Sequence, residues 1–369
     1  GNFSGVKLEF DPHLSTPKCT NIVPSPLFET FPVSRIPADL SVYGPHTIKD
    51  VEKKSFHPVK HVSVLEVNFA SDVVREVVHS NFEPLSVAEI VAGTPLLAGL
   101  NRKSSNGYMC EVDKAYYIDY ENKKFTPEFE DELHQLEENI IGGKLDVKDV
   151  LWKSSLKDEL RHVDKKGVPR SFRISRIHIQ VLTKKFFGRL VEMIIRDRDR
   201  NQIMVGVNPY KDWPKMYKKM LEYAGLWAAD IGTYDGKMLP QMQYALNNIV
   251  LEKLICSKRD KLVAKFLLYN MPVCLLGVND DTYLTTHSMP SGSFLTAMFN
   301  SLINRMYTAV WFFRYYNDTP SVAAYNNLVL DYVYGDDKIN GIREINGKTK
   351  DLHALSMRET FESFGMRFT

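Results

Sequence analysis

The sequence predicts an α+β fold, because helices and antiparallel strands are mixed without a regular alternation of strand and helix. Three segments support this class. The segment LVLDYVYGDDKINGI, residues 328–342, has apolar runs on both sides of a Gly-Asp pair, which is typical of a β-hairpin. A long apolar helix is expected over 292–316, just before this hairpin. The segment GLWAADIGTYDG, residues 225–236, indicates a short buried strand that runs into a turn.

The composition is that of a soluble globular protein. Of the 369 residues, 44% are hydrophobic and 25% are charged, and the net charge is only +2. A basic surface would therefore have to come from local clusters of lysine and arginine. No apolar run approaches the length of a membrane span, and the first residues lack a signal-peptide pattern. The cysteines are far apart, which argues against a zinc ribbon or a disulfide framework and favours a reducing cytosol: Cys19, Cys110, Cys256 and Cys274.

Several further elements are expected along the chain. Residues 1–60 are rich in proline and indicate an extended strap. Helices are expected near 63–80, 83–98, 127–140, 214–224, 239–257 and 352–365. The segment FRISRIHIQV, residues 172–181, alternates apolar and polar residues with period two and predicts a strand, and 271–278 predicts another.

Acidic residues gather at the ends of the predicted strands. Asp336 and Asp337 are adjacent at the tip of the hairpin, where their charges repel. A Gly-Asp pair is also common in ordinary turns, so the hairpin alone does not indicate a metal site. Asp230 ends the predicted strand at 225–230, and Asp235 follows five residues later. If this strand lies beside the hairpin, the carboxylates could hold two cations about 4 Å apart, as in phosphoryl transfer.

Polar residues also mark the predicted helix at 292–316. Ser291 and Gly292 precede it and form a plausible N-cap with a flexible lead-in. Thr296 and Asn300 are four residues apart and therefore share one face of the helix. Polar groups on a buried face need partners, and the Asn300 amide and the Asp235 carboxylate could bind a ribose hydroxyl.

A basic segment lies at residues 157–173. It contains Lys157, Arg161, Lys165, Lys166, Arg170 and Arg173 among only three acidic residues. Such a run is often a solvated surface, but beside a carboxylate site it could bind phosphate groups, which arginine grips with two hydrogen bonds. Asp158 and Glu159 are better explained as structural partners of these basic residues.

The order of these segments resembles the conserved motifs of viral RNA-dependent RNA polymerases from picornavirus-like positive-strand viruses (order Picornavirales). D-x4-D at 230–235, S-G-x3-T-x3-N at 291–300 and Y-G-D-D at 334–337 resemble motifs A, B and C. KDELR at 157–161, with Arg170 and Arg173, resembles motif F. SSNGY at 104–108 resembles motif G, and KCTNIVPSPLFE at 18–29 resembles the index-finger strand.

The resemblance implies a function and a set of site residues. The expected reaction is RNA-directed nucleotidyl transfer with two Mg²⁺ or Mn²⁺ ions. The catalytic residues would be Asp230, Asp336 and Asp337, and the metal ligands would be these three and the Ile231 carbonyl. Nucleotide would be bound by Lys157, Arg161, Arg170, Arg173, Asp235, Ser291, Gly292, Thr296 and Asn300, with Lys157 and Arg173 the strongest candidates. Template would be bound by Ser104, Ser105, Asn106 and Gly107.

The resemblance also implies partners, a location and a division of the chain. The partners would be template and product RNA, ribonucleoside triphosphates and a genome-linked protein primer, in replication complexes of the host cytoplasm. The expected right-hand architecture has fingers at 1–225, with a strap at 1–60, and palm at 226–262. Fingers return at 263–287, and palm with motifs B, C and part of D follows at 288–369. The thumb would be missing, so the chain alone would elongate RNA weakly or not at all.

Two alternatives remain open at this stage. A reverse transcriptase also has a Y-x-D-D hairpin, although it usually places a bulky aromatic residue where Asp235 stands. A non-catalytic RNA-binding module could use the basic segment without any carboxylate chemistry.

Overall fold

The computed structural model describes residues 20–22, 34–40, 48–56, 58–107, 110, 112–165, 169–278 and 281–369. Most of the expected strap at 1–60 lies outside the described residues, as do Tyr108 of the SSNGY segment and Lys166 of the basic segment. The described part is a mixture of helices and mainly antiparallel sheets, which confirms the predicted α+β class.

A three-stranded antiparallel sheet contains the predicted hairpin. Its order is β11 (Val329–Tyr334), β12 (Asp337–Ile342) and β7 (Gly225–Ala229). Side chains alternate between the two faces of a strand, so Leu330 and Tyr332 point to one face and Asp331 to the other. The sheet can therefore be covered by different elements on its two sides.

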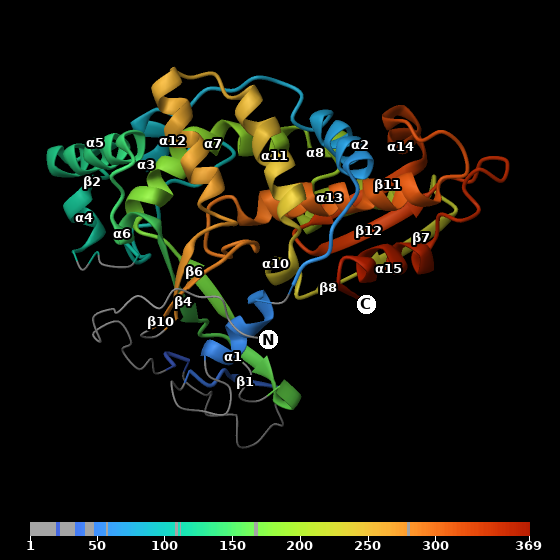
Figure 1. Cartoon of the computed structure of the whole chain (residues 1–369), viewed down its shortest axis with the longest axis horizontal. Helices are drawn as coiled ribbons and strands as arrows, with labels where there is room; N and C mark the ends of the chain where they lie inside the picture. The colour runs from blue at the N-terminus through green and yellow to red at the C-terminus, as the bar shows by residue number, and fades with distance from the viewer. Residues whose placement is uncertain are drawn as a thin grey trace.

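One face of this sheet is covered by the predicted long helix, α13 (Thr296–Tyr315). Fifteen of its 20 residues are buried, so the helix is enclosed on nearly its whole circumference. Four helices surround α13 and the sheet (Figure 1): α2 (Val64–Arg75), α11 (Pro240–Lys253), α14 (Val322–Leu328) and α15 (Ala354–Ser363).

The other face of the sheet packs on a smaller apolar cluster of Met204, Tyr223, Leu330 and Tyr332, beside α9 (Pro209–Met220). Helix α9 begins five residues before the expected start at 214. Asn208 caps it, because its side-chain oxygen accepts a hydrogen bond from the Tyr210 backbone N–H at 3.0 Å.

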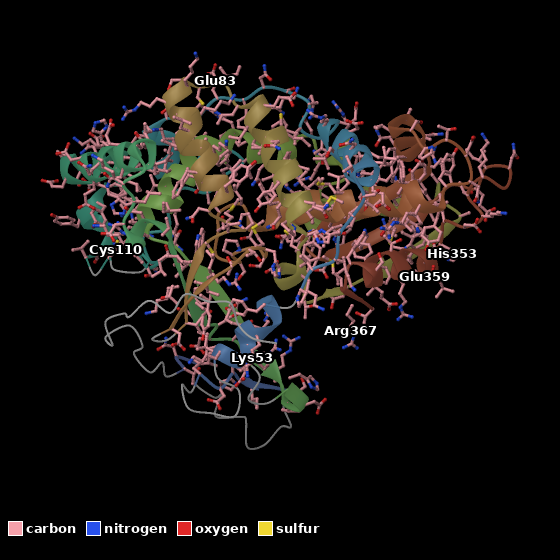
Figure 2. The ribbon with its side chains drawn as sticks, in the orientation of Figure 1. Lys53, Glu83, Cys110, His353, Glu359 and Arg367 are labelled. Atoms are coloured by element: carbon pink, nitrogen blue, oxygen red, sulfur yellow. The ribbon has the colours of Figure 1, made fainter. Side chains whose placement is uncertain are left out.

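A second sheet forms the lower part of the molecule in Figure 1. Its order is β10 (Asp281–Leu284), β9 (Leu275–Val278), β4 (Leu151–Leu156) and β6 (Ser171–Ile174), with β9 and β4 parallel. Nearby lie the pair β1 (Arg35–Pro37) and β5 (Leu160–His162), α1 (Ile48–Glu52), and the short turns η3 (Lys53–Phe56) and η4 (Val163–Lys165). Figure 2 shows Lys53 in this lower part and His353, Glu359 and Arg367 on the side of α15.

The remaining elements are mostly helical. They are α3 (Val87–Ala92), α4 (Lys114–Tyr117), α5 (Pro127–Gly142), α6 (Val147–Val150), α7 (Ile177–Arg196), α8 (Arg198–Asn201), α10 (Tyr234–Lys237) and α12 (Lys258–Tyr269). Two short strand pairs complete them: β2 (Ile118–Asp119) with β3 (Lys124–Phe125), and β8 (Ile231–Gly232) with β13 (Arg367–Phe368).

Two further sequence predictions were wrong at element boundaries. The strand predicted over 172–181 ends at Ile174, and α7 begins at Ile177. Fourteen residues of α7 are buried, so apolar residues occur on most sides of this helix and mimic a period of two. The helix predicted over 83–98 ends at Ala92, because Gly93 takes a φ of +88° that most residues avoid.

Two predictions made from the composition concern disulfide bonds and membrane-spanning helices. Cys110, Cys256 and Cys274 are free thiols, as expected for a chain without a disulfide framework, and Cys19 lies outside the described residues. In the part of the chain that the structure describes, no helix is both long enough and apolar enough to cross a bilayer.

Candidate active site

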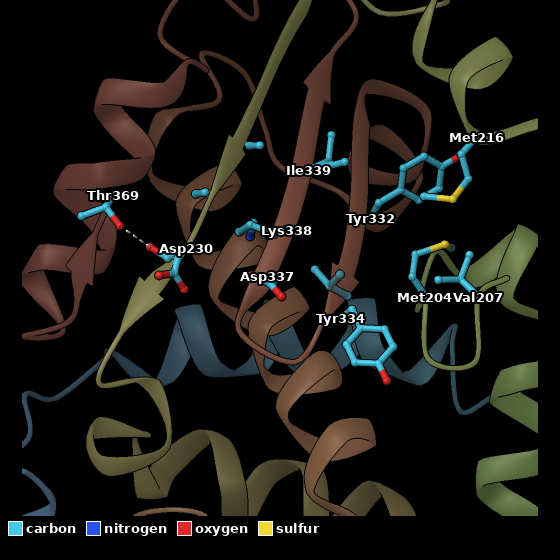
Figure 3. Close-up of a pocket in the computed structure, with 13 residues that line it drawn as sticks. Met204, Val207, Met216, Asp230, Tyr332, Tyr334, Asp337, Lys338, Ile339 and Thr369 are labelled. Carbon is cyan, nitrogen blue, oxygen red and sulfur yellow. Dashed lines mark hydrogen bonds between the residues drawn. The ribbon is translucent and has the colours of Figure 1, made fainter. Parts of the chain in front are cut away.

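The structure brings Asp230 and the Asp336–Asp337 pair to the same end of the three-stranded sheet. Tyr334 of β11 pairs with Asp337 of β12, which leaves Gly335 and Asp336 as a two-residue turn. Gly335 takes a φ of +64°, as tight hairpin turns require. In the neighbouring pair, Ala229 is opposite Lys338, so the next position along β7 places Asp230 level with Asp337. Figure 3 shows both carboxylates at this end of the sheet.

The backbone of Asp230 is held on its other side by Thr369. The Asp230 N–H donates to the Thr369 carbonyl at 2.8 Å, and the Thr369 N–H donates back to the Asp230 carbonyl at 3.0 Å. The Thr369 hydroxyl also donates to the Asp230 carbonyl at 3.2 Å (Figure 3). The pairing continues into β8 and β13, where Ile231 is opposite Phe368 and fully buried. Asp230 is therefore positioned by strands on both sides, while its side chain stays exposed.

The carboxylates repel one another. Partial burial, followed by the charges of Asp235, Asp337 and Asp230, raises the pKa of Asp336 to about 6, although its side chain remains open to solvent. Burial also raises the pKa of Asp337, again with a contribution from Asp230. Such crowding of negative charge favours a bound cation. Within the described residues, no three His, Cys, Asp or Glu side chains converge closely enough to hold a metal ion by themselves.

A cavity of about 450 Å³ adjoins the carboxylates. Asp230 and Asp337 lie at its border, and Met204, Met216 and Tyr332 line its apolar part (Figure 3). The second apolar cluster of the fold therefore lies directly beside the acidic end of the sheet.

Asp235 and Asn300, the two residues expected to bind a ribose hydroxyl, contact each other. The Asn300 side-chain N–H donates to the Asp235 carboxylate at 2.6 Å, and the Tyr234 hydroxyl donates to the Asn300 backbone carbonyl at 2.8 Å. The side-chain oxygen of Asn300 is buried and has no hydrogen-bond partner. A buried acceptor without a partner is unfavourable, so this atom is well suited to accept a hydrogen bond from a ligand hydroxyl.

The lead-in to α13 differs from the prediction. Ser291 and Gly292 lie in a turn, and the helix begins only at Thr296, so Ser291 is not its N-cap. The Thr296 hydroxyl instead hydrogen-bonds to the Pro290 and Ser293 carbonyls, each at 2.9 Å. Gly292 is required by close packing, because a Cβ at this position would lie 2.2 Å from the Arg173 backbone oxygen.

Arg173 lies inside the protein. Its guanidinium donates to the Glu52 carboxylate at 2.6 and 3.2 Å and to the Ser288 hydroxyl at 2.6 Å. Both charged side chains are almost fully buried, at 4% and 2% exposure. Burial works to raise the pKa of Glu52, but the charge and hydrogen bonds of Arg173 outweigh it and leave the pKa below its usual value. Arg173 therefore joins α1 to the segment before Ser291.

Arg170 lies at the surface, where it is paired with Glu159. It donates two hydrogen bonds to Glu159, at 2.6 and 2.5 Å, and its side chain is 54% exposed. These bonds raise the pKa of Arg170, and the charge of Asp336 adds to the increase. Lys157 and Arg161 also pair with Glu159, at 3.4 and 3.5 Å, so Glu159 is the structural partner that the sequence predicted.

The segment 104–107 is held at its ends. The buried Lys114 ammonium donates to the Ser104 carbonyl at 3.0 Å, and the Ile177 N–H at the start of α7 donates to the Asn106 carbonyl at 2.7 Å. The Ser104 and Ser105 side chains are exposed, whereas Asn106 is buried and donates to the Val112 carbonyl at 2.6 Å. Gly107 takes a φ of +84° beside the Ser175 carbonyl.

Sequence reasoning missed the polar residues beneath the hairpin. Asp331 and Lys338 are fully buried on the face of the sheet that α13 covers, with 3.6 Å between the carboxylate and the ammonium. Burial lowers the pKa of Lys338 to about 8. Asn304 of α13 is also fully buried and contacts the turn. A signal existed, because single charges in the apolar runs of a predicted strand need buried partners.

Comparison with known proteins identifies the family. The family model described as viral RNA-dependent RNA polymerase matches residues 51–369. The chain is 26% identical over 318 residues to the replicase polyprotein of Cricket paralysis virus, covering 78% of this chain and 18% of that protein. It is also 26% identical over 344 residues to the genome polyprotein of Porcine enterovirus 9, covering 89% of this chain and 15% of that protein. The chain thus spans less than a fifth of the length of these curated relatives.

A solved structure shows the same fold. The Sicinivirus 3Dpol RNA dependent RNA polymerase superposes with a TM-score of 0.81 at 20% sequence identity, covering 96% of this chain and 74% of that chain. Together with the match over residues 51–369, this shows that the chain belongs to the viral RNA-dependent RNA polymerase family and resembles its Picornavirales members.

Proposed function

We propose that the polymerase containing this chain copies an RNA template by transferring nucleotidyl groups from ribonucleoside triphosphates to a growing RNA strand. The observation that supports this most directly is the arrangement at one end of the sheet. Asp230 comes level with Asp337 beside the turn that carries Asp336, and Asp235 and Asn300 form a hydrogen bond nearby. Groups suited to phosphate chemistry and to sugar recognition would thus share one site.

The acidic residues would hold two divalent cations, Mg²⁺ or Mn²⁺. The ligands would be the Asp230, Asp336 and Asp337 carboxylates and the Ile231 carbonyl. Bound cations of this kind neutralise charge on the attacking and leaving oxygens of a phosphoryl transfer. Mg²⁺ is usually held by one or two carboxylates together with substrate phosphates and water. The absence of a three-residue cluster among the described residues is compatible with such a site, because the nucleotide would complete it.

Other residues would orient the nucleotide. Arg170, Lys157 and Arg161, which share Glu159, would move to the triphosphate, since phosphate oxygens compete well for arginine. Asp235 and Asn300 would recognise the ribose 2′-hydroxyl. Ser291, Gly292 and Thr296 would shape the loop beside that pair. Arg173 would act on the nucleotide through Ser288 and this loop, because its own guanidinium is already paired with Glu52.

The proposal extends to partners and organisation. Ser104, Ser105, Asn106 and Gly107 would contact template RNA, and the product RNA would be primed by a genome-linked protein. Synthesis would take place in replication complexes of the host cytoplasm. Residues 1–225 and 263–287 would form fingers, and 226–262 and 288–369 would form palm.

The decisive experiment compares Asp336→Asn with the unaltered sequence in a primed-template assay, each within the polymerase that contains this chain and not in the chain alone. Mg²⁺-dependent incorporation of ribonucleotides is expected in the unaltered protein and only background incorporation in the variant. Binding of RNA should be unaffected, which separates lost chemistry from lost RNA binding. Equal incorporation by both proteins would overturn the proposal. RNA binding without any synthesis in the unaltered protein would favour a non-catalytic RNA-binding module.

A further inference from the structure

The Gly335–Asp336 turn is anchored from below by α13. The Gly335 N–H donates to the Ser301 hydroxyl oxygen at 2.8 Å. The Asn304 side-chain N–H donates to the Gly335 carbonyl at 3.0 Å and, more weakly, to the Asp336 carbonyl at 3.4 Å. Ser301 and Asn304 of α13 therefore hydrogen-bond to the backbone N–H and the backbone carbonyls of the turn.

The orientation of the Asn304 amide is set by a buried charge. Its side-chain oxygen accepts a hydrogen bond from the Lys338 ammonium at 3.1 Å, so its N–H₂ group must face the turn. The same ammonium donates to the Thr308 hydroxyl at 2.5 Å. Rotating the amide by 180° would direct its N–H₂ group at an ammonium and its oxygen at the Gly335 carbonyl, and both contacts would be repulsive.

Lys338 is in turn held by Asp331 on the neighbouring strand. The Asp331 carboxylate lies 3.6 Å from the ammonium and also accepts hydrogen bonds from Asn340 at 2.8 Å and from the Tyr325 hydroxyl at 2.8 Å. These side chains are all buried. The Asp331 carboxylate and the Lys338 ammonium each have several buried hydrogen-bond partners, and these bonds favour one arrangement of the two side chains.

From these contacts we infer that Asn304 is a positioning residue, which the Asp331–Lys338 pair orients so that it holds the Asp336 turn in its active geometry. This inference rests on the proposed function for its catalytic consequence. Asn304 does not face the space where substrate would bind. It acts through the backbone of the residue that carries the carboxylate, and a small displacement of that carboxylate would misplace a metal ligand.

The test uses Asn304→Asp. The change preserves the size of the side chain and the acceptor for Lys338, but it points a second oxygen at the Gly335 carbonyl. The matched control is Asn247→Asp. Asn247 of α11 is also buried, and its side-chain N–H donates to the Leu268 carbonyl at 3.2 Å, away from the hairpin. Each variant loses one side-chain N–H that donates to a backbone carbonyl. Only in Asn304→Asp does that carbonyl belong to the turn.

Three measurements are compared between the two variants. Hydrogen–deuterium exchange of the peptide 333–338 should become faster in Asn304→Asp alone. Binding of Mn²⁺, followed by electron paramagnetic resonance, should weaken in the same variant. In the polymerase assay, kcat should fall roughly 10- to 100-fold while KM for the nucleotide changes little. The control should match the unaltered protein in all three measurements.

The outcomes separate this inference from the proposed function. If Asn304→Asp and its control show equal exchange, equal Mn²⁺ binding and equal kcat, the inference is wrong while the polymerase assignment stands. If the unaltered protein synthesises no RNA, the proposed function fails, whereas the exchange result still decides whether Asn304 holds the turn. Should Asn304→Asp not fold, Asn304→Ala with Asn247→Ala as its control gives the same comparison.

Discussion

Asn300 donates a 2.6 Å hydrogen bond to Asp235, across 65 positions of sequence, and leaves its own side-chain oxygen buried without a partner. The bond joins α13 to α10, the short helix that follows the Asp230 strand. The Asp235 backbone carbonyl also accepts a hydrogen bond from the Met289 N–H at 2.9 Å, so both the backbone and the side chain of Asp235 are held. The Asn300 amide and the Asp235 carboxylate are thus fixed beside the acidic end of the sheet.

The first prediction concerns sugar selection. Asn300→Ala should lower the preference for ribonucleotides over deoxyribonucleotides by about tenfold, because roughly one hydrogen bond to the 2′-hydroxyl is lost. The measurement is the ratio of kcat/KM for the two nucleotide classes, with Asn247→Ala as a buried control. An unchanged ratio in Asn300→Ala would contradict this role. A preference of the unaltered enzyme for deoxyribonucleotides would favour the reverse-transcriptase alternative.

The second prediction concerns Arg170. Arg170→Gln should raise KM for the nucleotide by about tenfold or more, because a charged hydrogen bond to the triphosphate is removed. Thermal stability should change little, since the side chain is 54% exposed. Arg259→Gln is the matched control, because Arg259 is similarly exposed and pairs with Glu138 on another face of the fold. An equal effect of both variants on KM would refute a nucleotide contact by Arg170.

The third prediction concerns the buried pair of Arg173 and Glu52. Arg173→Met should lower the free energy of unfolding by about 3–5 kcal/mol, because it leaves the Glu52 carboxylate buried without its partner. The double variant with Glu52→Gln should recover a large part of this loss, since no buried charge then remains. Urea unfolding of the two single variants and the double variant measures the coupling. Additive losses would show that the pair does not interact as the structure describes.

The fourth prediction concerns pH and His178. Burial lowers the pKa of this imidazole to about 4, with the Arg176 charge adding to the effect and the Glu132 carboxylate opposing it. The unfolded chain has the ordinary pKa near 6.5, so it binds a proton more readily than the folded protein does. The stability that the neutral His178 contributes is therefore complete above pH 6.5 and is lost as pH decreases from 6.5 towards 4. The loss from His178 should be about 2 kcal/mol between pH 7.5 and pH 5.

The measurement for His178 is urea unfolding at the two pH values. His178→Gln should remove most of this pH-dependent loss, while it keeps a donor for Glu132, to which His178 is hydrogen-bonded at 2.7 Å. His134→Gln is the control, because His134 is largely exposed and should not change the pH dependence. If His178→Gln loses as much stability at pH 5 as the unaltered protein, the folded imidazole is protonated there and the prediction fails.

Local sequence patterns determined the elements that carry the carboxylates. The β-hairpin was predictable because glycine at a positive φ and apolar runs on both sides are local requirements of a two-residue turn, and Gly335 meets them. The long helix α13 and the strand before Asp230 follow from the spacing of apolar residues. The order of the D-x4-D, S-G-x3-T-x3-N and Y-G-D-D segments, together with the basic segment and SSNGY, indicated the polymerase family, which the comparisons confirmed.

Only the tertiary structure decided which side chains meet. Arg170 and Arg173 belong to the same basic segment of the sequence. In the structure, β6 directs Arg173 to Glu52 in the interior. Arg170 remains exposed, and its pKa is affected by the charge of Asp336. The buried pair of Asp331 and Lys338 depends on the packing of α13 against the sheet. Register between distant strands and the burial of a charge depend on contacts between segments far apart in the chain, and no local pattern of residues encodes them.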